Sequence, residues 1–185
     1  MSPKRRGEVI FSGIGGGGVL LIGECVARAA SKAYENVVWF PNYSAAVRGG
    51  SCECFVIYSD EAIASPVLSQ VQTVVVLDPA QVKASEPRVR PGGTLIVESG
   101  GLSQEVERKD ITLVKVPALE QARAAGNARG SNFIILGRYI AATKLIEPAL
   151  VEQDLEARFG SNAQVLAANL QAFRMGLDSG IAVGT

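Results

Sequence analysis

The stretch that decides the fold lies near the start of the chain, where residues 9–30 read VIFSGIGGGGVLLIGECVARAA. The apolar run Val9-Ile10-Phe11 predicts a strand, the glycine-rich segment after it predicts a turn, and residues 19–30 have the character of a helix. In such a unit, backbone N–H groups and the helix N-terminus face a common point that suits an anion. Glycine is useful there because no side chain holds a phosphate away from the backbone. This stretch therefore predicts a strand–turn–helix unit with an anion-binding turn.

The spacing of Gly13, Gly15 and Gly18 also fits the dinucleotide-binding fingerprint Gly-x-Gly-x-x-Gly. That spacing alone is weak, because a tightly packed turn between a strand and a helix would use glycines too. A nicotinamide-binding unit should also offer an acidic residue at the end of its second strand. Here that end reads Trp39-Phe40-Pro41-Asn42, with no acid and no basic cluster. An independent nicotinamide or flavin enzyme therefore ranks below the other interpretations.

Length and composition predict a single folded domain over residues 1–185, since 48% of its residues are hydrophobic. Lys plus Arg and Asp plus Glu balance at 18 each, which argues against a nucleic-acid-binding protein. We expect a flexible basic tail over residues 1–7, an α/β sheet portion over 8–126 and a helical portion over 127–180. No apolar run approaches the length of a membrane span, and the basic residues at the start lack the apolar region expected of a signal peptide.

The residues that usually carry chemistry are scarce. The chain has no histidine, which removes the commonest general base and the commonest metal ligand. Its three cysteines, Cys25, Cys52 and Cys54, cannot by themselves supply the four ligands of an iron–sulfur cluster. We expect buried free thiols in a reducing cytoplasm, with Cys52 and Cys54 on the same face of one strand. The sequence thus predicts neither a catalytic residue nor a metal ligand.

Alternation of strands and helices, followed by helices only, predicts an open α/β sheet with a helical C-terminal end. The second and third strands are connected too closely for a parallel crossover, so we expect the third to run antiparallel in a mostly parallel sheet. A helical turn is expected near 65–68, and Ser161 is expected to cap the last helix. Beyond the first strand, the expected strands are 37–40, 52–58, 71–77, 94–97 and 111–116, and the expected helices are 78–85, 117–125, 132–145, 147–159 and 161–177.

Three segments should meet at one edge of this sheet. Ligands of open α/β sheets lie outside the carboxyl ends of the parallel strands. The glycine turn, the loop of residues 43–50 and Asp78 all leave strands at that edge in the expected topology. Arg48 in that loop suits a bidentate grip on phosphate or carboxylate, although it could instead pair with an acidic neighbour or cap a helix. The predicted ligand-binding residues are Gly13, Gly15, Gly16, Gly17, Gly18, Tyr43, Arg48, Gly49 and Gly50.

Several of these segments, taken in order, resemble the gamma subunit of 2-oxoacid:ferredoxin (acceptor) oxidoreductases. The likeness extends over about residues 8–177 and is closest to the 2-oxoglutarate and branched-chain 2-oxoacid types, with pyruvate enzymes second. The segments that carry it are Gly13-Ile14-Gly15-Gly16-Gly17-Gly18, Trp39-Phe40-Pro41-Asn42-Tyr43, Arg48-Gly49-Gly50, residues 56–67, Pro91-Gly92-Gly93-Thr94, and Asn132 with Leu136-Gly137.

The resemblance implies a Rossmann-like domain that serves a larger enzyme. Such enzymes decarboxylate a 2-oxoacid on thiamine diphosphate, pass electrons through iron–sulfur clusters to ferredoxin and form an acyl-CoA. Thiamine diphosphate and the clusters are then expected on companion alpha, beta and delta (ferredoxin-like) subunits. For this chain the resemblance implies a role in assembly and in binding coenzyme A. It further implies that the isolated chain is inactive and able to form a homodimer.

Two segments depart from the family pattern. The family usually carries glutamine where this chain has Gly17, and Gly-Pro-Glu where it has Ser44-Ala45-Ala46. A purely structural role therefore stays open, in which apolar faces of the last helices dock companion chains. Core packing explains those faces equally well. The residues concerned are Ile134, Ile135, Tyr139, Leu166, Leu170 and Phe173.

Overall fold

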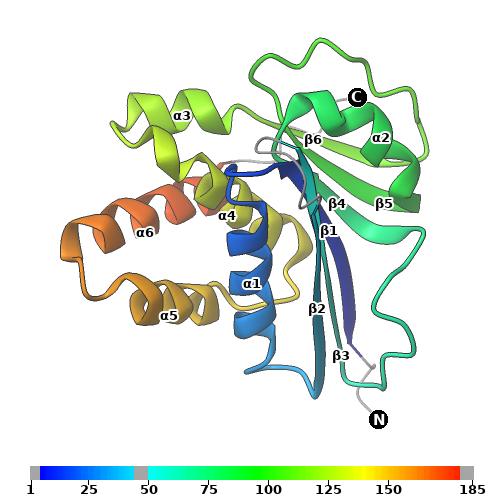
Figure 1. The fold of residues 1–185 in the computed structure, drawn as a ribbon, viewed down its shortest axis with the longest axis horizontal. Helices are drawn as coiled ribbons and strands as arrows, with labels where there is room; N and C mark the ends of the chain where they lie inside the picture. Colours follow the sequence, from blue (N-terminus) through cyan, green and yellow to red (C-terminus); the bar gives the residue numbers. More distant parts are fainter. Residues whose placement is uncertain (1–4, 44–49, 180–185) are drawn as a thin grey trace.

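The protein folds around a twisted six-stranded sheet with the strand order β2-β3-β1-β4-β5-β6 (Figure 1). The structure is a computed structural model that describes residues 5–43 and 50–179, with Tyr43 described by its backbone only. The strands are β1 (Arg6–Ile14), β2 (Asn36–Tyr43), β3 (Ser51–Ser59), β4 (Val71–Val76), β5 (Val89–Glu98) and β6 (Thr112–Val116).

Strand β3 is the reversed strand of this sheet. It pairs antiparallel with both β1 and β2, while β1, β4, β5 and β6 are mutually parallel. Since β3 is antiparallel to both of its neighbours, β1 and β2 point in the same direction, and β3 separates them. The predicted antiparallel third strand and the predicted mostly parallel α/β sheet are confirmed. As a result, β1, β2 and β4 all end at the same edge of the sheet.

The longer helices lie together on one face of the sheet, and a shorter helical segment covers part of the other (Figure 1). On the first face are α1 (Val19–Ala30), α3 (Ala118–Ala124), α4 (Ser131–Thr143), α5 (Pro148–Phe159) and α6 (Ala163–Asp178). On the second face are η1 (Pro79–Gln81), α2 (Val82–Ser85) and η2 (Glu86–Arg88), while the short turn η3 (Ala128–Gly130) leads into α4.

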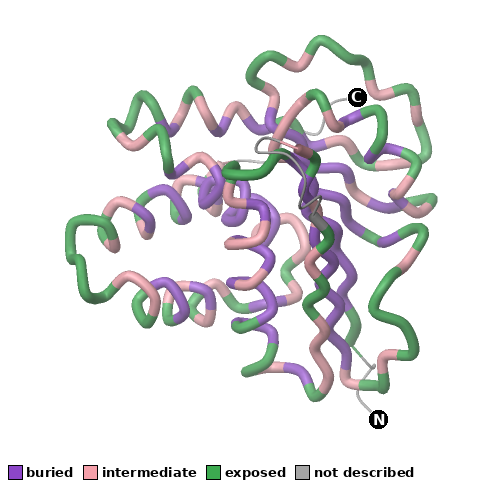
Figure 2. Tube along the Cα trace, viewed as in Figure 1, coloured by how far each residue is buried: buried purple, intermediate pink, exposed green. Residues whose placement is uncertain are grey.

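Buried residues follow the strands and the helices packed on them (Figure 2), and they form two hydrophobic clusters, one on each face of the sheet. The larger joins α1, α4 and the helical end to the sheet, with Phe11, Ile22 and Tyr139 among its buried members. The smaller lies on the opposite face around Phe55 and Leu95. Of the six apolar residues that could have docked a partner, Ile134, Ile135, Tyr139 and Phe173 are buried in the larger cluster and Leu166 and Leu170 pack against it. Core packing therefore explains this set.

Helices α4 and α6 cross at a pair of glycines. A Cβ atom added at Gly137 would collide with the carbonyl of Phe173, and one added at Gly176 would collide with the carbonyl of Ile134. Side chains at these positions would hold the two backbones apart, so the close crossing depends on their absence. This contact fixes α4, whose first turn lies beside the glycine turn.

Several boundaries differ from the sequence-based expectation. Strand β1 begins at Arg6, inside the expected tail, because it pairs with β3 over its full length and Arg5 forms an ion pair with Asp60 (3.1 Å). Residues 65–68 form no helical turn. Strand β5 begins at Val89 and includes the expected 91–93 turn, with a register shift against β4.

The N-cap of α6 is Asn162 rather than Ser161. The Asn162 side chain accepts a hydrogen bond from the amide of Val165, as an N-cap residue should. Within the described ranges, no helix is both long and apolar enough to span a bilayer.

Candidate functional site

The turn between β1 and α1 has a backbone that only glycine adopts easily. Gly16 and Gly18 have φ angles of 93° and 82°, in the left-handed region. The turn is closed by two hydrogen bonds, from the Gly15 amide to the Gly50 carbonyl and from the Gly17 amide to the Ile14 carbonyl, each 3.0 Å. The first of these ties the glycine turn to the residue that precedes β3.

The same geometry leaves other amides of the turn unused. The first hydrogen bond of α1 runs from Ile22 to the carbonyl of Gly18 (3.1 Å), so the preceding N–H groups have no helical partner. Within the described ranges, no backbone hydrogen bond engages the amides of Gly16 and Gly18. Both glycines are at least partly accessible to solvent. The turn therefore presents N–H donors that no described backbone group engages, at the positive end of a twelve-residue helix.

These donors border a cavity of about 380 Å³. It opens between the glycine turn and the start of β3, and its described lining carries no charged side chain. That lining is Ile14, Gly15, Gly16, Gly18, Val19, Leu20, Leu21, Gly50, Ser51 and Cys52. The cavity combines an apolar wall with backbone donors at one end, which is the character of many small-ligand sites.

Helix α4 packs against the glycine turn. A Cβ atom added at Gly18 would collide with the side-chain amide of Asn132, which is buried in the first turn of α4. The Asn132 Oδ1 atom accepts a hydrogen bond from the amide of Phe133 (3.0 Å). Gly18 thus combines a positive φ angle with a close side-chain contact. The sequence signalled Asn132 only through the family resemblance.

The convergence predicted from topology is observed in the described residues. The Leu77 amide at the end of β4 donates to the carbonyl of Ser12 (2.8 Å), and Asp78 follows beside Gly13. The Asp78 carboxylate accepts the amide of Ala80 (3.0 Å), so it caps the helical turn after β4. Asp78 therefore serves the local structure of that edge.

The second predicted segment is described only at its two ends. Tyr43 ends β2, where its backbone pairs with Cys52, and Gly50 lies against the glycine turn. Arg48 and Gly49 lie outside the described residues, so their part in the site stays a prediction. Gly13, Gly15, Gly16, Gly17 and Gly18 form the end of β1 and the turn.

The three cysteines are buried free thiols, as predicted. Burial raises the pKa of Cys25 and that of Cys54 to about 12, so both stay protonated at neutral pH. Cys52 and Cys54 belong to the same hydrophobic cluster, which confirms that they share a face of β3. No group of three or more metal-binding side chains occurs in the described part of the chain.

One known protein family matches nearly the whole chain. The family described as "Pyruvate ferredoxin/flavodoxin oxidoreductase" matches residues 8–179, nearly the whole chain. The chain belongs to this family. The region matched by the pyruvate ferredoxin/flavodoxin oxidoreductase family includes all six strands, except the first two residues of β1. It also includes every helix of the described residues.

Curated relatives in this family include proteins of two lengths. The chain is 30% identical over 173 residues to the ketoisovalerate oxidoreductase subunit VorA of Methanothermobacter thermautotrophicus, covering 92% of this chain and 36% of that protein. It is 26% identical to the 2-oxoglutarate synthase subunit KorC of Methanothermobacter marburgensis, covering 92% of this chain and 95% of that protein. This chain therefore spans about a third of the length of VorA and nearly all of KorC.

Solved structures of the family share the fold. The gamma subunit of a keto/oxoacid ferredoxin oxidoreductase from Geobacter sulfurreducens superposes with a TM-score of 0.81 at 25% identity, covering 94% of this chain and 95% of that one. A 2-oxoglutarate:ferredoxin oxidoreductase from Magnetococcus marinus, described with 2-oxoglutarate, coenzyme A and succinyl-CoA bound, superposes with a TM-score of 0.85 at 22% identity. That match covers 95% of this chain and 31% of the longer one, and it shows the fold alone.

Proposed function

We propose that the chain is the gamma component of a cytoplasmic 2-oxoacid:ferredoxin oxidoreductase. The whole assembly would convert a 2-oxoacid, coenzyme A and oxidised ferredoxin into an acyl-CoA, CO₂ and reduced ferredoxin. In this proposal the chain contributes assembly and coenzyme A binding. Its partners would be alpha, beta and delta subunits, with ferredoxin reached through the complex. Membership of the family and the gamma-type fold support this assignment.

The observation that carries the coenzyme A part is the glycine turn. The amides of Gly16 and Gly18, which no backbone group within residues 5–43 and 50–179 engages, lie at the N-terminus of α1 beside a cavity of about 380 Å³. Hydrogen bonds to a charged phosphate oxygen are among the stronger ones in proteins. The apolar wall formed by Ile14, Val19 and Leu20 suits the less polar part of such a ligand. The donors and the wall therefore fit one phosphate-bearing end of coenzyme A.

The chemistry of the reaction is assigned to companion subunits. Thiamine diphosphate would supply the decarboxylation and iron–sulfur clusters the electron transfer. This chain's cysteines are buried, and two of them have a strongly raised pKa, which opposes the thiolate form that clusters require. The role of this chain's own residues is to hold the phosphate with backbone N–H groups and to balance its charge with Arg48.

Calorimetric titration with coenzyme A tests this proposal, on the isolated chain and on the assembled complex. We expect the substitution Arg48→Ala to weaken binding by roughly ten- to a hundredfold, the range of a lost charge-assisted hydrogen bond. The matched control is Arg174→Ala, which removes an exposed guanidinium paired with Glu152 on the helical portion (2.7 Å). An assembled Arg48→Ala enzyme with the wild-type KM for coenzyme A would contradict the role of Arg48.

A scaffold role without a small ligand is the second candidate, and the edge strand β2 favours it. Trp39 and Phe40 are 37% and 42% exposed on this strand, whose outer edge pairs with no described strand. Exposed aromatic side chains on a sheet edge are typical of protein contacts. Copurification of companion subunits with a chain that binds no coenzyme A would select the scaffold role.

A further inference from the structure

Arg138 on α4 is a buried guanidinium with few partners. The residue is 3% exposed, and its Nη1 atom donates to the carbonyl of Ser179 at the end of α6. Its Nη2 atom is buried and has no hydrogen-bond partner among residues 5–43 and 50–179. Burial lowers the pKa of Arg138, since desolvation disfavours the charged form.

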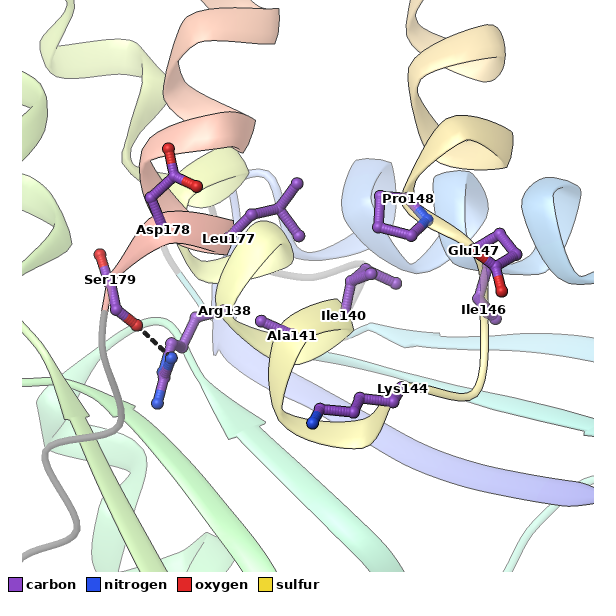
Figure 3. Close-up of a pocket in the computed structure, with 10 residues that line it drawn as sticks. All are labelled: Arg138, Ile140, Ala141, Lys144, Ile146, Glu147, Pro148, Leu177, Asp178 and Ser179. Atoms are coloured by element: carbon purple, nitrogen blue, oxygen red, sulfur yellow. Dashed lines mark hydrogen bonds between the residues drawn. The ribbon is translucent and has the colours of Figure 1, made fainter.

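A buried arginine normally has an anionic partner, because an unpaired buried charge strongly destabilises a protein. The described residues form no ion pair with Arg138. Figure 3 shows the Arg138 side chain leaving α4 toward Ser179, while the carboxylate of Asp178 points away from the guanidinium. The described part of the chain thus leaves the charge of Arg138 without a counter-charge.

Arg138 lines two cavities, and Ser179 also belongs to the lining of both. The larger, about 470 Å³, lies between the ends of α4 and α6 and also includes Lys144 (Figure 3). The smaller, about 280 Å³, lies against the carboxyl-terminal half of β6 and has no acidic residue in its described lining. That lining is Val114, Lys115, Val116, Pro117, Gln121, Arg138 and Ser179.

Another residue that lines the same small cavity has a second buried polar atom without a described partner. Gln121, on α3, has a buried Oε1 atom without a partner among the described residues. Among the described residues, the cavity therefore brings together a donor of Arg138 and an acceptor of Gln121 that both have no hydrogen-bond partner. It also lies toward the carboxyl end of a parallel strand, where open α/β sheets bind ligands.

We propose that Arg138 anchors a second anion site, selective for a phosphate group, in the small cavity at the end of β6. Phosphate offers several acceptor oxygens to the guanidinium fork of Arg138. A phosphate monoester, with its second pKa near 6, also exists in a protonated form, and inorganic phosphate keeps a hydroxyl at neutral pH, so either can donate to Gln121. This chemistry satisfies both unpartnered atoms at once.

The site is separate from the glycine turn. Strands β4 and β5 lie between β1 and β6, so the two strand ends are three strand spacings apart, or about 14 Å. The inference does not depend on coenzyme A binding at the turn. The phosphate could be free in solution or part of a larger ligand, and the experiment distinguishes these sources.

Thermal unfolding with inorganic phosphate, against sodium chloride of equal ionic strength, tests the site on the full chain. We expect phosphate at ~100 times its Kd to raise the Tm of the wild-type chain by ~5–10 °C. Arg138→Met should abolish this shift, and Arg138→Lys, which loses the guanidinium fork, should reduce it. The control Arg174→Met removes an exposed arginine and should keep the full shift.

A second measurement compares the Tm of Arg138→Met with that of the wild-type chain in phosphate-free buffer. If the partner of the guanidinium is an external anion, the Tm of Arg138→Met in phosphate-free buffer should equal or exceed that of the wild type. The reason is that an apolar side chain replaces an unpaired charge. A Tm lowered by ~10 °C or more, or a failure to fold, would show that the chain itself pairs the guanidinium, and would overturn the proposal. A wild-type chain that phosphate does not stabilise would also overturn it.

The last comparison assigns the phosphate to one of the two sites and identifies its source. Gly16→Ala should keep the shift in inorganic phosphate, and loss of the shift in this variant alone would move the phosphate to the glycine turn and refute the Arg138 site. Weaker binding of coenzyme A to Arg138→Met than to wild type, with dephospho-coenzyme A unaffected, would identify the 3′-phosphate as the occupant. Equal binding of both would identify free phosphate.

Discussion

Glycines do opposite things in two regions of this molecule. In the β1–α1 turn, Gly16 leaves open space, and an added Cβ atom would meet nothing within 4 Å. At the α4–α6 crossing, an added Cβ at Gly137 or Gly176 would collide with backbone of the facing helix. The first kind of glycine exposes donors to a ligand, and the second allows two helices to touch. Substitutions should therefore damage binding in one region and stability in the other.

The largest effect is expected at the helix crossing. Gly137→Ala places a methyl group against the carbonyl of Phe173, and the backbone can yield only if the helices separate. We expect the free energy of unfolding to fall by about 3 kcal/mol, measured by urea denaturation. The control is Gly126→Ala, which has a φ of +74° and open space, and it should cost only about 1–2 kcal/mol of backbone strain. Equal losses in the two variants would refute the close-crossing account.

The substitution Gly16→Ala, with the next largest effect, separates ligand affinity from folding stability at the glycine turn. Gly16→Ala carries the same kind of backbone strain as Gly126→Ala, since its φ is +93° and its surroundings are open. We expect a similar loss of stability in both, but a roughly tenfold weaker affinity for coenzyme A in Gly16→Ala alone. Calorimetry and thermal unfolding on the two variants provide the measurement. If Gly126→Ala weakened binding equally, the turn would not be the ligand's contact.

The rate of thiol labelling measures access to the cavity beside the glycine turn without any substitution. Cys52 lines the cavity, whereas Cys25 and Cys54 lie deeper and have a pKa near 12. Because alkylation needs the thiolate, iodoacetamide at pH 8 should modify Cys52 severalfold faster than the other two. Coenzyme A should slow that reaction, as followed by mass spectrometry. Labelling of Cys25 first would contradict this order of access.

The smallest effect is expected for Gly17→Gln, which introduces the residue that the family resemblance implies at this position. Gly17 has no positive φ, and the nearest atom to an added Cβ is the Ile14 carbonyl at 3.2 Å. This contact is tight, so the Ile14 carbonyl must shift by a few tenths of an ångström, and stability should fall by about 0.5–1 kcal/mol. The added amide should strengthen coenzyme A binding by about two- to fivefold, the value of one neutral hydrogen bond. A loss of affinity would show that the glutamine side chain blocks the cavity.

Local patterns in the sequence predicted what is local in the structure. The apolar run before Gly13 and the helical spacing after Gly18 gave β1 and α1, and the short connection to β3 gave its reversal. The same patterns could not show that β3 lies between β2 and β1, since strand order depends on contacts between distant residues. The boundary errors at Arg6 and Val89 have the same origin, because pairing with neighbouring strands extends both strands.

Two important residues carried no local signal of their role. Arg138 looks like an ordinary polar position of a helix, and only the packing of α6 and β6 around it makes it buried and unpaired. Gly176 looks like a weak point in a helix until α4 is placed against it. Burial of charge and the approach of two backbones are properties of the assembled fold, so no spacing rule along the chain reveals them.

The antiparallel pair formed by β2 and β3 has an evolutionary consequence. Its last backbone pair, Tyr43 with Cys52, fixes where the intervening connection leaves and re-enters the sheet. Insertions or deletions between Tyr43 and Gly50 would leave the remaining ladder in register, because the pairing of β2 with β3 ends at Tyr43 and the pairing of β3 with β1 begins at Ser51. Descendants of one ancestral chain could therefore acquire new ligand preferences at this edge by changing one connection, without any compensating change in the core.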